Sequence, residues 1–209
     1  NEPIAHVHLA LTHVVHGDLT GAEAELTRAA RRAAQLGFPR GPFMHAYALF
    51  VESWMCVEAG QLDRAAVLAA DLIDRAARHD FDEFRLWGAA QQDTVRALAA
   101  LSADDPDPTA LSAHIATMTS FLDTLRTFEL LMYVTYFDAV LGRLLIAAGQ
   151  PEQARHRLDT ALALAHDTGL CFYGAELLRL KAHTHTDPDA RQADITAALA
   201  RHQGATVFE

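Results

Sequence analysis

The sequence predicts an all-α fold, a right-handed αα superhelix of about five helical hairpins, and three observations carry this prediction. Ala, Leu, Arg, Glu and Gln dominate the 209 residues, and all of them favour helix. Apolar residues recur three and four positions apart, as in Leu26, Ala29, Ala30 and Ala33, which is the helical period. Glycine, proline or aspartate interrupts this pattern about every twenty residues. Between the interruptions there is room for about ten helices of roughly 14–20 residues, joined by short turns.

Three of the glycines that end predicted helices share one set of spacings, and they are Gly17, Gly60 and Gly149. Each has an alanine five residues later, a small residue seven residues earlier and a second break twenty residues later. The alanines are Ala22, Ala65 and Ala154, the small residues are Ala10, Ser53 and Gly142, and the second breaks fall at Gly37, Asp80 and Gly169. The recurrence predicts a repeat with one helical hairpin in each unit.

The physical reason for the pattern is the close crossing of two helices. A small residue midway along the first helix and an alanine early in the second let the two helices approach. Glycine adopts the left-handed conformation that ends a helix without steric cost. Each hairpin then leaves an apolar face that only the next hairpin covers.

The five hairpins follow in chain order. They turn at Gly17, at Gly60, at the acidic proline-containing loop 104–108, at Gly149 and at residues 187–188. The third unit spans residues 83–128, and a shortened fifth unit spans residues 172–203. Two residues depart from the pattern, because Asp93 stands where the third unit needs a small residue and Lys181 stands at a normally apolar position.

Composition and charge exclude several classes of function. Seventeen Lys and Arg against 27 Asp and Glu give a net charge of −10, which argues against nucleic acid or an anionic membrane as the main partner. Neither an apolar run of the roughly 18–20 residues that a membrane span needs nor a signal-peptide pattern at the N-terminus is present. The two cysteines, Cys56 and Cys171, lack CxxC spacing and are predicted to be buried structural thiols in a reducing compartment, the cytoplasm.

No enzyme signature appears in the sequence, which predicts a non-enzymatic chain without a cofactor. Histidines at positions 6, 8, 13 and 16, and again at 183 and 185, leave metal binding open as an alternative, but no carboxylate completes a ligand set beside the first group. For His183 and His185 a solvated loop is the favoured interpretation. The acidic groups at residues 80–83 and 104–107 are interpreted as helix caps and solvated turns.

The repeat spacing resembles the tetratricopeptide repeat, although the units are longer than is usual for that repeat. Four segments are similar to helical repeats of large bacterial signalling proteins: residues 33–39, 79–88, 172–181 and 203–209. Those proteins join a STAND-type nucleotide-binding ATPase to an adenylate cyclase-like or LuxR-type output domain. The resemblance implies that residues 1–209 are a single tetratricopeptide-like repeat domain, a fragment of a longer chain. It implies a cytoplasmic signal-sensing and protein-interaction role, and the other domains of the full-length chain as partners.

In a tetratricopeptide-like array, the first helix of each hairpin lines a concave groove. Counting back from the turn glycine in the second and fourth units, using the small-residue register in the fifth and taking the counterpart tryptophan in the third gives seven candidate contacts for a protein or small-molecule effector. They are Tyr47, Trp54, Trp87, Tyr136, Arg143, Glu176 and Arg179. We expect most of these side chains to face one concave surface and to be partly accessible to solvent. The alternative is that the aromatic residues, Trp54 and Trp87 above all, pack between hairpins.

Two alternatives come from other classes of function. In the first, the chain is a scaffold that self-associates through the open ends of its superhelix. In the second, which has less support, it is a metal-dependent helical enzyme. Residues 203–205 look like a turn and residues 206–209 like the start of another helix, so we expect an uncovered apolar end there.

Overall fold

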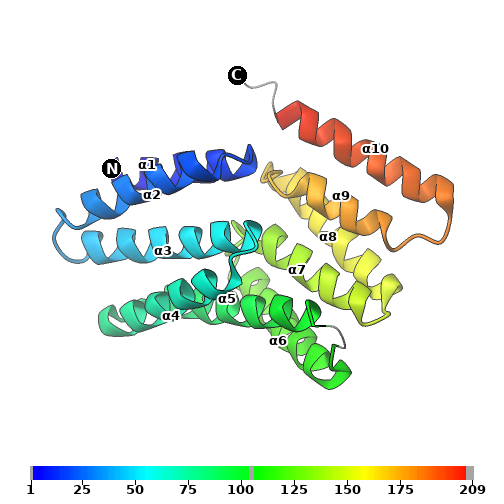
Figure 1. Cartoon of the computed structure of the whole chain (residues 1–209), viewed down its shortest axis with the longest axis horizontal. Coiled ribbons are helices and arrows are strands. Elements are labelled where there is room, and N and C mark those ends of the chain that lie inside the picture. The colour runs from blue at the N-terminus through cyan, green and yellow to red at the C-terminus, as the bar shows by residue number, and fades with distance from the viewer. Residues whose placement is uncertain (1, 104–105, 206–209) are drawn as a thin grey trace. The chain divides into compact units, whose positions relative to one another are not determined.

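The computed structural model describes residues 2–103 and 106–205, and within these ranges the chain forms ten helices and no strand (Figure 1). The all-α prediction is therefore confirmed. None of the described helices combines the length and the apolar character that crossing a membrane requires. The chain divides into two compact units, residues 1–99 and 100–209. The single superhelix over residues 1–209 stays a prediction.

Unit 1 is a series of helices that pack on their neighbours in the chain. Its helices are α1 (Glu2–Val15), α2 (Leu19–Ala33), α3 (Arg40–Glu58), α4 (Leu62–His79) and most of α5 (Asp82–Leu101). Helix α1 packs on α2, α2 on α3 and α3 on α4, and α1 also reaches α3. The core of the unit lies along α3, where Phe50 and Trp54 are fully enclosed together with Leu72 of α4 and Phe84 of α5.

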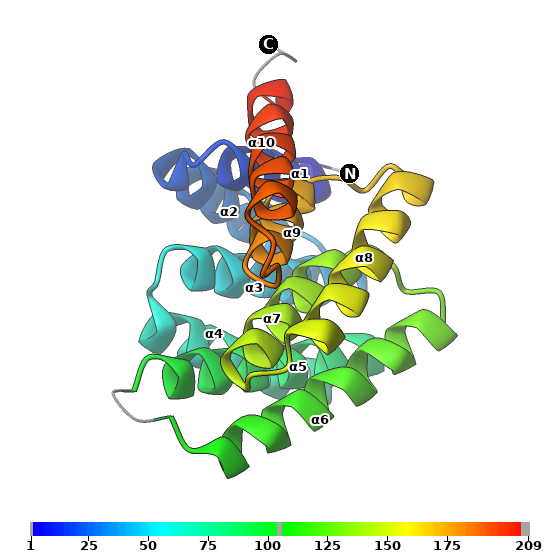
Figure 2. The same ribbon diagram turned by 90° about the vertical axis from the view of Figure 1, so that its right-hand side faces the viewer.

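Unit 2 repeats this mode of packing (Figure 2). Its helices are α6 (Pro108–Thr127), α7 (Val134–Ala147), α8 (Pro151–Thr168), α9 (Gly174–Ala182) and α10 (Pro188–Ala205). Each helix packs on the next, and α7 also contacts α9. The core lies along α7, with Tyr136, Phe137 and Leu144 enclosed. Asp107 caps α6 by accepting a hydrogen bond from the Thr109 amide at 2.9 Å, as predicted for the acidic loop, whereas residues 104 and 105 lie outside the described residues.

The turn glycines adopt the conformation that their spacing predicts. Gly17, Gly60 and Gly149 have φ of +76°, +71° and +70°, which is the left-handed region. The second break is also left-handed in two of the three cases, with φ of +55° at Asp80 after α4 and +74° at Gly169 after α8. These residues end their helices and reverse the chain.

The predicted crossing residues lie in the helix contacts. Ala22, Ala65 and Ala154 have no exposed surface. In the α3–α4 pair, the Ser53 hydroxyl donates a hydrogen bond to the Ala65 carbonyl at 3.0 Å. In the α7–α8 pair, a methyl group added to Gly142 would lie 2.9 Å from Cδ2 of Leu158, so the helices approach more closely than a larger residue allows.

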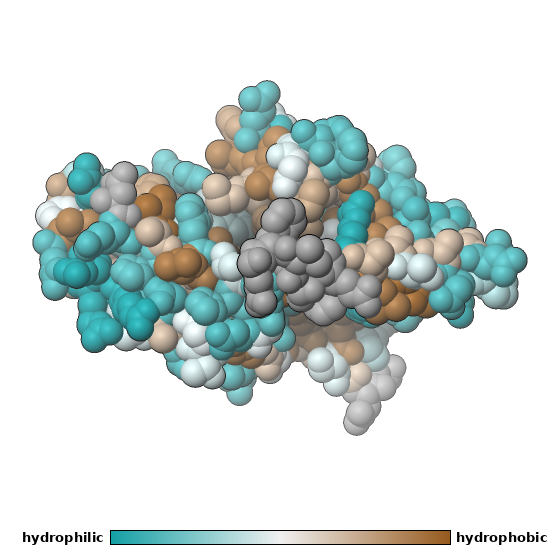
Figure 3. Space-filling model, turned by 90° about the horizontal axis from the view of Figure 1, so that it is seen from above, coloured by the Kyte–Doolittle hydropathy of each residue, from teal (hydrophilic) through white to brown (hydrophobic). Residues whose placement is uncertain are grey.

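The C-terminal region differs from the prediction. Helix α10 continues through residues 203–205, so the expected turn there is wrong, and residues 206–209 lie outside the described residues. Ile195 and Leu199 of α10 are 36% and 58% exposed, which agrees with an uncovered apolar face on the last helix. Figure 3 looks onto the face that carries α10 and shows hydrophobic residues at the surface among hydrophilic ones.

Candidate functional site

The three predicted groove residues of unit 1 are core residues. Tyr47, Trp54 and Trp87 are only 6%, 2% and 7% exposed, so the expectation of partial accessibility is wrong for them. The physical reason is that α5 lies against α3. The rings of Phe50 and Trp87 are 5.1 Å apart, and those of Tyr47 and Phe84 are 6.5 Å apart. Aromatic side chains at these positions therefore pack between helices.

Tyr136 of unit 2 is also buried, with 1% of its surface exposed. Its ring lies 4.7 Å from that of Phe137 and 5.5 Å from that of Tyr173, which directly precedes α9. Partial solvent accessibility was also predicted for Tyr136, and this prediction is wrong as well. All four aromatic residues of the predicted groove thus contribute to the cores of their own units.

The three charged residues of the predicted groove lie together at the surface of unit 2, and we call Arg143, Glu176 and Arg179 the arginine–glutamate cluster. Arg143 of α7 donates to Glu176 of α9 at 2.7 Å. Arg179, one turn further along α9, donates to both oxygens of the same carboxylate, at 2.6 Å from Nε and 2.8 Å from Nη2. The sequence prediction brought these three residues onto one surface, and the structure places them in direct contact.

Local structure explains the geometry of the cluster. Glu176 and Arg179 are three residues apart on a helix and therefore share a face. The contact between α7 and α9 carries Arg143 to the same face. Planar guanidinium groups match a carboxylate with parallel hydrogen bonds, so one glutamate orients both arginines.

The electrostatics of the cluster favour an ionised glutamate. Partial burial raises the pKa of Glu176, but hydrogen bonds and charge from Arg179 and Arg143 outweigh burial and hold this pKa below its usual value. Arg179 is 51% exposed, so part of its guanidinium group faces solvent and can attract an anionic group.

A second charged cluster in unit 2 lies inside the protein and was not predicted. Asp138 of α7 is fully buried, and Arg126 of α6 and Arg157 of α8 donate to its two oxygens at 2.6 and 2.7 Å. Burial raises the pKa of Asp138 above its usual value, although the charges and hydrogen bonds of Arg126 and Arg157 act in the opposite direction. The one signal in the sequence is an aspartate, the only charged residue in the otherwise uncharged and largely apolar stretch 134–142. The cluster joins three helices and has a structural role.

Several of the histidines each contact one polar side chain. His6 contacts Glu25 at 2.6 Å, His8 contacts the Tyr47 hydroxyl at 3.2 Å, and His13 contacts Asp18 at 2.9 Å. His183 and His185 lie in the turn region between α9 and α10, where His183 is exposed as predicted, whereas His185 is half-buried and contacts Asp194 of α10 at 2.8 Å. Within the described residues, no group of three or more His, Cys, Asp or Glu side chains is placed to hold a metal ion.

The two thiols differ from each other. Cys56 is fully buried, as predicted, and burial raises the pKa of its thiol. Cys171 is exposed, so the prediction of a buried thiol is wrong there. It lies in the turn between α8 and α9, where its thiol is 3.2 Å from the Ala165 carbonyl. A turn exposes side chains that a helix of the same composition would bury.

The arrangement of the arginine–glutamate cluster suits the recognition of a carboxylate better than a chemical step. Its members are held by one another, and arginines do not lose their protons in proteins. Glu176 accepts from Nε and Nη2 of Arg179, and the remaining nitrogen of Arg179, Nη1, lies 3.2 Å from Nε2 of the exposed His183. No family model, no curated protein and no solved structure matches this chain.

Proposed function

We propose that the chain is a non-enzymatic protein-interaction and signal-sensing module, built from tetratricopeptide-like hairpins. The observation that carries the proposal is the repeated geometry of the helix pairs α1–α2, α3–α4 and α7–α8. Each pair has a left-handed glycine at its turn and a fully buried alanine five residues later. Repeated hairpins of this kind present extended surfaces, and binding is the use that such surfaces most readily serve.

The arginine–glutamate cluster is the proposed contact point for a partner. Arginine is enriched at the energetic centres of interfaces, because its planar head forms several hydrogen bonds at once. The exposed guanidinium group of Arg179 favours an acidic side chain or a terminal carboxylate. Because the chain as a whole has a net charge of −10, binding of an acidic partner depends on this local positive site.

The regulatory part of the proposal rests on the resemblance to bacterial STAND-type regulators. In such a protein the module would be cytoplasmic, and partner binding would favour one arrangement of the flanking ATPase and output domains over another. The chain would then bind the partner more tightly in one of these arrangements than in the other. The chemical reactions would be carried out by the other domains.

A binding measurement with defined peptides tests the proposal. The probe is a fluorescein-labelled amphipathic peptide of glutamate and leucine, and its control carries glutamine in place of glutamate. Fluorescence anisotropy is expected to show tighter binding of the acidic peptide. Arg143→Ala and Arg179→Ala should each weaken it about tenfold, which corresponds to about 1.4 kcal/mol.

The matched control is Arg96→Ala, which removes an exposed arginine of unit 1 and should leave the affinity unchanged. Equal binding of the two peptides, or the same affinity in all three variants, would contradict the assignment of the site.

Self-association is the second candidate, and the exposed Ile195 and Leu199 of α10 favour it. Light scattering after gel filtration distinguishes the two functions. A dimer that Leu199→Glu converts to a monomer, together with no binding of the acidic peptide, would replace the proposal with a scaffold.

A further inference from the structure

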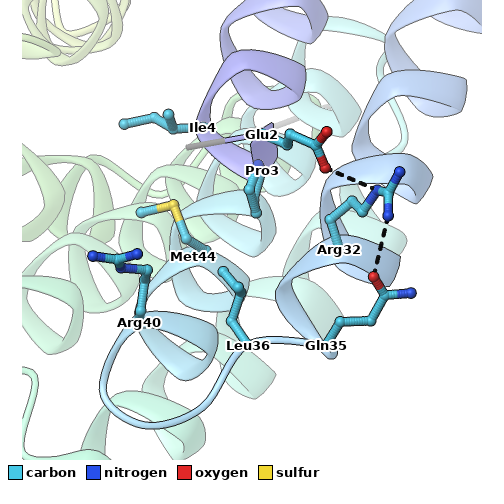
Figure 4. Close-up of a pocket in the computed structure, with 8 residues that line it drawn as sticks. All are labelled: Glu2, Pro3, Ile4, Arg32, Gln35, Leu36, Arg40 and Met44. Carbon is cyan, nitrogen blue, oxygen red and sulfur yellow. Dashed lines mark hydrogen bonds and ion pairs between the residues drawn. The ribbon is translucent and has the colours of Figure 1, made fainter.

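A pocket in unit 1 lies far along the chain from the arginine–glutamate cluster and has a different chemistry. It is formed by the start of α1, the end of α2 with the turn that follows, and the start of α3 (Figure 4). Its volume is about 410 Å³. Cavities of about 300–1,000 Å³ are the size that binds small organic molecules.

The inner wall of the pocket is apolar. Pro3 is buried, and Ile4, Leu36 and Met44 are half-buried. Figure 4 shows Pro3, Leu36 and Met44 between two polar sides. A flexible methionine beside branched side chains adapts to a ligand chain of variable shape. This wall therefore suits a hydrocarbon chain.

One polar side of the pocket is held in place. Arg32 contacts Glu2 at 3.2 Å from Nε and donates to Gln35 at 3.2 Å from Nη1. The two partners come from α1 and from the turn after α2, so they fix the guanidinium of Arg32 at the rim. Glu2 also neutralises the charge of Arg32.

The opposite side carries an uncompensated charge. Arg40, the first residue of α3, is exposed and lines the pocket, and the described part of the chain gives it no ion pair. With Glu2 and Arg32 cancelling, Arg40 leaves the pocket with a net charge of +1. Its guanidinium group is free to bind a carboxylate with two parallel hydrogen bonds.

We infer that this pocket binds a small organic monocarboxylate with an apolar chain, of which a medium-chain fatty acid is the simplest example. The carboxylate pairs with Arg40, and the chain lies on Pro3, Leu36 and Met44. A cation is disfavoured by the surplus positive charge. A polyphosphate is disfavoured because a single uncompensated arginine faces a largely apolar wall.

Isothermal titration calorimetry of the 209-residue protein with decanoate, below its micelle concentration, tests the inference. Decanol has the same chain without charge, and decyltrimethylammonium has the opposite charge. Decanoate is expected to bind at least tenfold more tightly than either, because only decanoate pairs with Arg40. Equal affinity for decanoate and decanol would overturn the inference.

Three variants locate the site. Arg40→Ala should weaken decanoate binding about tenfold or more, whereas Arg31→Ala, which removes an exposed arginine of α2 outside the pocket, should not change it. Met44→Trp should block binding by filling the cavity, with the helical circular dichroism spectrum retained. If Arg40→Ala and Met44→Trp both bind decanoate as the unmodified protein does, the ligand lies elsewhere and the inference is wrong.

Amide chemical-shift changes give an independent readout. Decanoate should move the signals of residues around the pocket, and shifts confined to α10, where Ile195 and Leu199 are exposed, would overturn the inference. The pocket and the arginine–glutamate cluster belong to different units, so failure of either binding test leaves the other proposal standing.

Discussion

The helix pairs α3–α4 and α7–α8 follow the same register and expose different residues. Six residues before the turn glycine, the first pair has Trp54, which is 2% exposed, and the second has Arg143, whose side chain is 29% exposed. Eleven residues before it, the first pair has Leu49 and the second has the buried Asp138. Equivalent backbone positions thus hold a core tryptophan in one unit and a surface ion pair in the other.

The helices that pack on α3 and on α7 also differ between the two units. In unit 1, the next helix is α5, which has 20 residues and places Phe84 and Trp87 against α3. In unit 2, α7 contacts α9, which has only nine residues and brings Glu176 to Arg143. The register decides which way a side chain points, and the length and composition of the neighbouring helix decide whether it stays in contact with water.

Replacing the residue six before the turn glycine should give the largest contrast between the units. Trp54→Ala is expected to lower the free energy of unfolding by about 3–5 kcal/mol, because it leaves a cavity in a closed core. Arg143→Ala should cost only about 1 kcal/mol, because solvent partly replaces the lost ion pair. Urea denaturation followed by circular dichroism measures both. Equal losses for the two variants would refute the comparison.

A smaller effect is expected where the helices cross. Gly142→Val should lower the free energy of unfolding by about 1–3 kcal/mol, because its side chain meets Leu158. Valine has a higher helix propensity than glycine, so a loss of stability in Gly142→Val reports the steric contact, and Ala147→Val, at an exposed position of the same helix, is the control that places valine where it meets no neighbouring helix. Ser53→Ala in the α3–α4 pair should cost about 1 kcal/mol through its lost hydrogen bond to the Ala65 carbonyl. A Gly142→Val variant as stable as its control would mean that α7 and α8 do not approach as described.

The arginine–glutamate cluster should make stability depend on pH. Because the folded-state pKa of Glu176 lies below the unfolded value of about 4.5, its stabilisation is present above that pH. It is lost as the pH falls through the folded-state pKa. The stability difference between the unmodified protein and Glu176→Gln, measured by urea denaturation from neutral to acidic pH, should therefore shrink on acidification. A difference that grows on acidification has the wrong sign for this cluster.

The smallest expected effect is a difference between the two thiols in their rate of labelling, which involves no loss of structure. Cys171 should react rapidly with Ellman's reagent in the folded protein, and Cys56 only after unfolding, because Cys56 is buried and its thiol pKa is raised. The variant Cys171→Ser retains only Cys56, so any labelling of this variant reports the reaction of the buried thiol. Rapid labelling of that variant under native conditions would contradict the burial of Cys56.

Sequence reasoning succeeded where the determinants are local. The left-handed conformation at Gly17, Gly60 and Gly149 and the burial of the alanines five residues later depend on the turn and one helix crossing. Both are encoded within about twenty-five residues, and the spacing alone predicted them.

The exposure of the candidate site depends on a third helix, which the spacing does not specify. Tyr47 and Trp87 face inward because α5 lies on α3, and the spacing alone did not decide between this packing and a place in the groove. The role of Asp138 needs Arg126 and Arg157, which lie 12 residues before and 19 residues after it on two other helices. Periodicity placed Arg143 and Glu176 on one surface but did not predict the ion pair between them, which depends on the contact of α7 with α9.

The helix contacts described above join helices that are adjacent or next but one along the chain. Packing of this kind has low contact order, so a pair of helices can form before distant parts of the chain have met. It also makes the architecture tolerant of duplication during evolution. A copied hairpin arrives with faces that already match those of its neighbours, and the chain can grow or shorten by about forty residues at a time without the design of a new core.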